Sequence, residues 1–281
     1  MAADWQLLDR LRSKVERAED HIHNLQVFWS AFKVNAYPVT FKDDTKRGKR
    51  IYRLGNIEPI PVDIPWMVGD AAHNLISALD HIAYHLVSVF TGGRGPFTNV
   101  YFPVAKNRRH SQFKLARTSE HKAEGGGIIK RLGKESIEAI ERIEPYQGGK
   151  GFILSYIHQL DIIDKHHMLL TVGSMNRSHT MAPSSIERYK RSGIGWDGMT
   201  PEQESVAFMT EAIGVQFPLK TGGKLATVAL SEVNENMYFP FEIAFGEPKV
   251  IEGKPVLETL HQGAGLIRDI IKDFDRRGLL P

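Results

Sequence analysis

The segment between Gly69 and His85 constrains the fold of this chain more than any other part of the sequence. Its residues, GDAAHNLISALDHIAYH, are apolar around most of a helix and polar along one line. Neither Lys nor Glu occurs from Gly69 to Phe90, although a solvated helix face usually carries both. Because a buried polar group without a partner costs a few kcal/mol, we expect this line to meet complementary groups, a metal ion or a substrate. Its members are Asp70, His73, Asn74, Ser77, Asp80, His81 and His85.

A second apolar segment, 151–170, also carries histidine and carboxylate side chains. The sequence GFILSYIHQLDIIDKHHMLL is typical of a largely buried helix, and the two segments together hold six of the chain's twelve histidines. Two helices that each present His and Asp can face one another inside a bundle. The polar positions of the second segment are His158, Asp161, Asp164, Lys165, His166 and His167.

Three chemistries are compatible with such a pair of helices. The first is a divalent metal site for Zn²⁺, Mn²⁺ or Fe²⁺ that activates water, because imidazole and carboxylate from facing helices are suitable ligands. The second is metal-free acid–base work, in which an Asp orients a His. The third is structural, with Asp80 paired to Lys165 and the network fixing how the helices pack. The metal site would use His81, His85, His158 and Asp161; the candidate catalytic residues are His73, Asp80, His81, Asp161, Asp164 and Lys165.

The remaining periodicities predict an α+β fold, a helical bundle with a buried His/Asp polar stripe plus an antiparallel β-sheet. Helical spacing recurs over 3–32, 64–90, 128–143, 151–170 and 256–277. Residues 37–60 are typical of a basic hairpin inserted in a mainly helical region, 1–172. The region 173–281 has β-branched and aromatic runs broken by GG and NEN turns, followed by a helix that we expect to pack back on the bundle.

Composition limits the function classes. The chain has no cysteine and a net charge of +3, and no apolar run approaches the length of a membrane span. We therefore expect a cytoplasmic protein without a membrane partner. The absence of GxxxxGK[ST] and GxGxxG patterns argues against a nucleotide cofactor. Basic residues gather at 46–53, where a hairpin would be able to hold RNA phosphates. The sequence is also compatible with a homo-oligomer.

Three motifs resemble those of a set of bacterial and phage proteins of unassigned function. They are GDAAHNLISALDH, PYQGG at 145–149 and HQLDIIDKHHMLL, against family patterns of approximately GDxxHNLRSALDH, PYxG and LHxLDxxDKHxxLL. The family segment RSALDH is in turn similar to the Arg–His signature of HEPN domains, helical bundles that often cleave RNA without a metal. Ile76 stands here in place of that arginine, so the pair with His81 is absent. The resemblance implies a helical fold rather than HEPN-type catalysis.

The function that these patterns favour is a hydrolase acting on a small-molecule ester, amide or phosphate, with metal-assisted water activation between the two polar helices. One alternative is a HEPN-like RNA-binding or RNA-cleaving protein of defence or toxin systems, using the hairpin at 46–53. Another is a non-catalytic interaction module whose polar network serves only packing.

Overall fold

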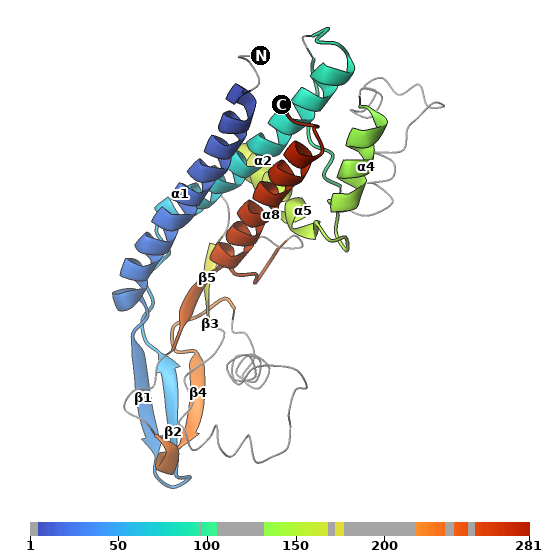
Figure 1. Ribbon diagram of the computed structural model, residues 1–281. Helices are drawn as coiled ribbons and strands as arrows, with labels where there is room; N and C mark the ends of the chain where they lie inside the picture. The colour runs from blue at the N-terminus through green and yellow to red at the C-terminus, as the bar shows by residue number, and fades with distance from the viewer. Residues whose placement is uncertain are drawn as a thin grey trace, which may run out of the picture.

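A computed structural model describes residues 5–95, 97–105, 132–167, 172–176, 217–233, 239–246 and 251–281. Helices form a bundle, and a small sheet extends beyond one end of it (Figure 1). This arrangement confirms the predicted α+β fold. In chain order the elements are α1 (Trp5–Ala36), β1 (Val39–Asp44), β2 (Lys49–Leu54), α2 (Asp63–Phe90), α4 (Lys134–Ile143), α5 (Phe152–His167), β3 (Val172–Asn176), β4 (Lys224–Ala229), the 3₁₀ turn Leu230–Glu232, β5 (Phe241–Phe245) and α8 (Val256–Arg276).

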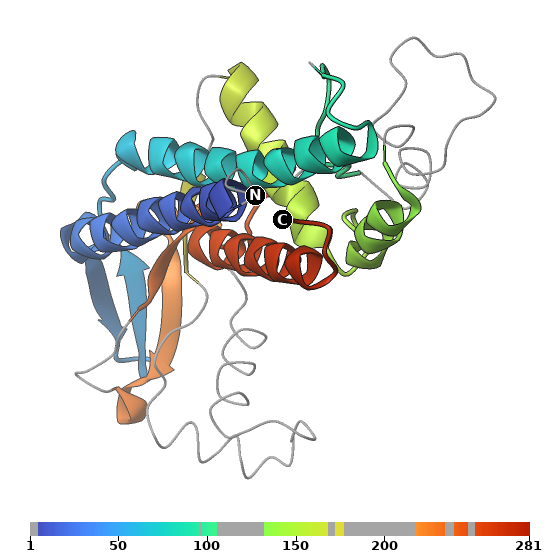
Figure 2. The same cartoon turned by 45° about the horizontal axis from the view of Figure 1, so that its top comes forward.

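The core lies where α1, α2, α5 and α8 meet. α1 packs on α2 and α8, and α5 packs on both α2 and α8. Figure 2 shows α5 crossing α2 while α1 and α8 lie along it. Apolar residues at helical spacing on α1 supply one side of this core, because positions three and four apart share a face. These residues are Leu11, Val15, Ala18, Ile22, Leu25 and Trp29, all at most 3% exposed.

The ends of α2 follow from local sequence. Its first turn, after Pro61, holds Asp63 and Pro65, and an acidic side chain there favours the positive end of the helix dipole. Its last turn stops at two glycines, Gly92 and Gly93, which adopt φ of 64° and 74°. The amide of Gly93 donates to the carbonyl of Ser88, 2.8 Å away, in a left-handed helix stop. The helix therefore covers the predicted range.

Within the described residues the β-strands form two sheets, whereas one was predicted from the region after residue 171. β1 and β2 form the expected antiparallel hairpin, and β4 pairs with β2 on its other side. β5 pairs instead with β3. Residues 217–220, which we expected to be extended, lie outside any strand and begin with the cis bond between Phe217 and Pro218. The two-region division at residue 172 stays a prediction, although β4 pairs with β2 and α8 packs on α1, α2 and α5, all from before that residue.

Candidate functional site

The polar line of α2 lies at the surface, so the prediction that the stripe is buried is wrong. His73 and His81 are exposed and Asp80 is half-buried, because the apolar positions of α2 already fill its contact with the core. The buried member of the predicted set is Asp161 on α5, with 2% of its surface exposed. The polar residues of α2 therefore meet different neighbours along the two edges of the helix.

Asp161 is the centre of the contact between the two polar helices. Its Oδ1 lies 3.0 Å from Nδ1 of His73 on α2, and its Oδ2 accepts a hydrogen bond of 2.6 Å from Nζ of Lys165, one turn later on α5. The carboxylate is thus satisfied on both oxygens, as burial requires. An ionised carboxylate only accepts, so Nδ1 of His73 carries the proton and Nε2 is the basic nitrogen of the ring.

Asp80 lies two turns after His73 on α2 and has an unusual acidity. Its Oδ1 accepts a 2.8 Å hydrogen bond from the backbone amide of Phe102. Burial raises the pKa of Asp80 to about 6, while the Phe102 hydrogen bond and the charge of Lys165 act in the opposite direction. The charges of Asp161 and His73 also act on Asp80, which places it beside the same cluster. The predicted pair between Asp80 and Lys165 is not formed, because the lysine bonds Asp161.

Asp164 approaches the backbone of α2 at Gly69. A Cβ at position 69 would lie 2.8 Å from Oδ2 of Asp164 and even nearer to its other carboxyl atoms, so only glycine accepts this contact without a shift. Burial raises the pKa of Asp164, and the negative charges of Asp70 and Asp161 raise it further. Asp164 therefore belongs to the same contact between α2 and α5 as predicted, at its edge toward the start of α2.

The other histidines of α2 point elsewhere. His81 lies toward α1, where burial and the positive charges of Lys14 and Arg10 lower its pKa. His85 lines a pocket shared with α4 and the end of α8. A rotation of about 100° per residue explains the division, because positions 73 and 80 share one side of the helix and positions 81 and 85 lie toward the other.

The predicted metal-ligand set is not assembled. Within the ranges that the structure describes, no three His, Asp or Glu side chains lie so that they could hold one metal ion. The geometric reason is that His81 and His85 lie on the edge of α2 that faces away from the buried carboxylate of Asp161 on α5. His158 is half-buried on α5. The full set predicted was His81, His85, His158 and Asp161.

The contact between α2 and α5 holds the elements of an acid–base site. A buried carboxylate orients a half-exposed imidazole, an ammonium group lies beside them, and a second carboxyl group has a pKa of about 6. Sequence reasoning found these four residues but missed the amide of Phe102. Nothing in the sequence places residue 102 against position 80, because the intervening chain leaves the helix and returns to it.

Trp66 and Tyr84 are exposed on α2, and Tyr146 forms an isolated bridge with Ala105.

None of the helices in the described ranges combines the length and the continuous apolar surface that a membrane span requires. No protein-family model, curated protein or solved structure matches the chain.

Proposed function

We propose that the protein is a hydrolase in which His73 activates water against an ester, amide or phosphate bond. The observation that carries this proposal is the pairing of a buried carboxylate, Asp161, with Nδ1 of a histidine that is 49% exposed. A fixed tautomer and an accessible second nitrogen are what general-base catalysis requires.

Asp161 has two roles in this proposal. Its hydrogen bond holds the imidazole of His73 in one orientation, so that Nε2 is available to accept a proton from water. Its negative charge also stabilises the imidazolium that forms when the proton is taken. Because Asp161 is almost fully buried, solvent screens this interaction less than it would at the surface.

Lys165 and Asp80 supply the complementary charges. The side chain of Lys165 is 44% exposed, so it can contact a substrate while its ammonium bonds Asp161. There it would stabilise the negative charge that develops on a carbonyl or phosphoryl oxygen. With a pKa of about 6, roughly one Asp80 in ten is protonated at neutral pH, and this form can donate a proton to a leaving group.

Substitution of His73 tests the proposal against a purely structural network. The substrates are p-nitrophenyl acetate, a p-nitroanilide and bis(p-nitrophenyl) phosphate. We expect His73→Gln and Asp161→Asn to reduce hydrolysis of the accepted substrate by about 10²- to 10⁴-fold. The matched control is His81→Gln, which changes an exposed histidine of the same helix that faces α1.

Two results would contradict the proposal. If the wild-type protein hydrolyses none of the three substrates, or if His73→Gln retains full activity while folded, the network serves packing as in the non-catalytic alternative. A chelator such as EDTA tests the metal-assisted version. Because the described residues bring no metal-ligand set together at His73, we expect activity to survive chelation.

RNA binding is a second candidate, favoured by one face of the β-hairpin. Residues that pair across the strands share a face, and this face presents Lys42, Lys49, Arg53 and Lys224 from three strands. All four are exposed. A row of cations on a projecting sheet is complementary to a phosphate backbone. This observation supports the RNA alternative independently of the His73 site.

The hairpin also shows which basic residues are poor choices for testing RNA binding. Arg50 donates two hydrogen bonds to Asp43, of 2.6 and 2.9 Å, and its guanidinium lies 3.9 Å from the centre of the Phe41 ring. Its charge is therefore already compensated within the hairpin. Lys42 and Lys49 on the opposite face are better probes.

The double variant Lys42→Glu with Lys49→Glu tests RNA binding. Single-stranded RNA affinity is measured over a range of salt concentrations, with Lys272→Glu on α8 as the control. If the hairpin holds phosphates, log K of the wild-type protein falls with log salt, and the double variant should make this slope less steep by about 1.4, since two phosphate contacts are lost. An unchanged slope removes the hairpin from RNA binding.

A further inference from the structure

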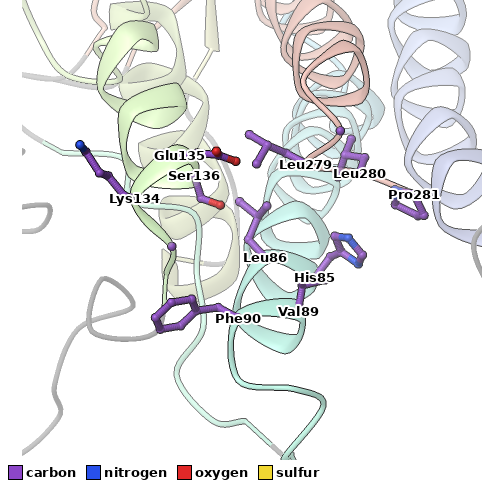
Figure 3. A pocket seen from close by; sticks show the side chains of 12 residues that line it. His85, Leu86, Val89, Phe90, Lys134, Glu135, Ser136, Leu279, Leu280 and Pro281 are labelled. Atoms are coloured by element: carbon purple, nitrogen blue, oxygen red, sulfur yellow. The ribbon is translucent and has the colours of Figure 1, made fainter.

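A pocket of about 590 Å³ lies at the far end of α2 from His73. It is bordered by the last turns of α2, the first turn of α4 and residues 278–281 after α8 (Figure 3). His85, on its wall, is twelve residues beyond His73, which corresponds to about 18 Å along the helix axis. The volume is in the range of pockets that hold small organic ligands, and the position separates it from the acid–base site.

One part of the pocket is apolar. Its side chains come from two elements that are distant in sequence, the end of α2 and the segment after α8. Val89 and Phe90 are 66% and 55% exposed, which is unusual for large apolar side chains that gather in a hollow. A ligand with a hydrocarbon or aromatic portion would cover them. The apolar lining consists of Leu86, Val89, Phe90, Leu279 and Leu280.

The opposite part of the pocket is the start of α4, which offers hydrogen-bond donors. The N-cap is Gly133, so no side chain caps the helix. The first backbone amide with a carbonyl partner at this end is that of Ile137, which bonds Gly133. The amides of residues 134–136 precede it, and the helix dipole makes this end favourable for an anion.

Ser136 provides an independent sign of a ligand. It is one of few buried polar residues in the described part of the chain, with 7% of its surface exposed. It lines the pocket, and Figure 3 shows its hydroxyl directed toward the hollow. Among the described residues that hydroxyl has no hydrogen-bond partner, in contrast to the similarly buried Ser155, which donates to the carbonyl of Phe152 at 2.7 Å. The Ser136 oxygen is reached from the pocket, so a ligand there would supply the missing hydrogen-bond partner.

We propose that this pocket binds an amphiphilic anion, a carboxylate or phosphate monoester attached to an apolar tail. The headgroup would accept hydrogen bonds from the amides at the start of α4 and from Ser136. The tail would lie on the apolar lining. Glu135, on the same turn, is the one group of the α4 turn that opposes an anion, and it gives the proposal a sensitive test.

The experiment measures binding of octanoate and octyl phosphate by calorimetry. Octanol tests the tail alone and inorganic phosphate tests the headgroup alone. We expect the two amphiphiles to bind at least about tenfold more tightly than either partial probe, and the stronger of the two identifies the headgroup. Ser136→Ala should weaken binding about tenfold, as loss of a hydrogen bond to a charged group predicts, while Ser155→Ala should leave it unchanged.

A second variant keeps the test decisive if Ser136→Ala disturbs folding. Glu135 is exposed, and Glu135→Gln removes the charge that opposes an anion. The variant should therefore bind the two anions about two- to fivefold more tightly and bind octanol as the wild type does. Equal binding of octanol and octanoate would overturn the proposal, since it would show an apolar crevice only. Insensitivity of octanoate binding to both Ser136→Ala and Glu135→Gln would place the binding elsewhere and would also overturn it.

Discussion

The half-buried carboxyl group of Asp80 should reduce stability at neutral pH, and Asp80→Asn tests this directly. An asparagine keeps the shape of the side chain, and its carbonyl oxygen can still accept the hydrogen bond from the amide of Phe102. It removes the negative charge that burial disfavours. We therefore expect the variant to be more stable than the wild-type protein where Asp80 is ionised, even though Lys165 loses one favourable neighbour.

The magnitude follows from the pKa of Asp80, which burial raises from 3.8 to about 6. The folded state then binds the proton more tightly than the unfolded chain, so the free energy of unfolding falls as the pH rises from about 4 to about 6. The difference between the two pKa values corresponds to about 3 kcal/mol. Because the group is only half-buried, solvent screening reduces the expected effect to about 1–2 kcal/mol.

Urea denaturation at about pH 4 and about pH 8 measures this effect through the linear dependence of stability on denaturant. We expect Asp80→Asn to gain about 1–2 kcal/mol over the wild type at the higher pH and little at the lower pH. A variant that is less stable at the higher pH, or a gain that is the same at both, would refute the reasoning. The same variant should lose hydrolysis of substrates with poor leaving groups, which links the destabilising charge to the proposed acid.

Two further predictions concern packing and the buried carboxylate. Gly263→Ala should lower stability by about 1–3 kcal/mol, since its Cβ would lie 2.9 Å from Cγ1 of Ile157. Gly265→Ala on the same helix meets nothing within 4 Å and should raise stability by about 0.5–1 kcal/mol. Thermal unfolding compares the two variants, and equal effects on stability would contradict the close contact at Gly263. Lys165→Met should lower the free energy of unfolding by about 1–3 kcal/mol, because Asp161 would keep only one of its two partners. If chemical denaturation shows no loss of stability, the ion pair contributes nothing to it.

The helices were predictable because each has a continuous apolar periodicity, but not every end was. α1 runs to Ala36, beyond the predicted end at residue 32, and α4 begins at Lys134 instead of residue 128. α2 and α8 agree with the expected 64–90 and 256–277 to within a residue at each end. The β1–β2 hairpin was predicted, but β3 was not predicted as a strand and the partners of β4 and β5 were not found. The pairing of β4 with β2 is a contact between distant parts of the chain. Alternation within one strand carries no information on which edge it joins.

The site was predictable in its members but not in its exposure. The partnership of His73 with Asp161 follows from two helices that present complementary residues. The error was to infer burial from the absence of Lys and Glu on α2. A short polar side chain such as His or Asn is equally suited to the edge of a helix contact, where long charged chains would not pack. The described residues do not bring the predicted metal ligands together, because His81 and His85 lie on the other edge of the helix from Asp161.

The hydrogen bond from Nε1 of Trp29 to the carbonyl of Phe241 joins residues 212 positions apart. During synthesis at about 5–20 residues per second, the indole emerges roughly 10–40 s before its partner. The apolar face of α1 must therefore wait for β5 and α8 before it is covered, although α2 can pack on it earlier. A chain organised in this way completes its folding late, and on the ribosome its first helix is a natural client for chaperones.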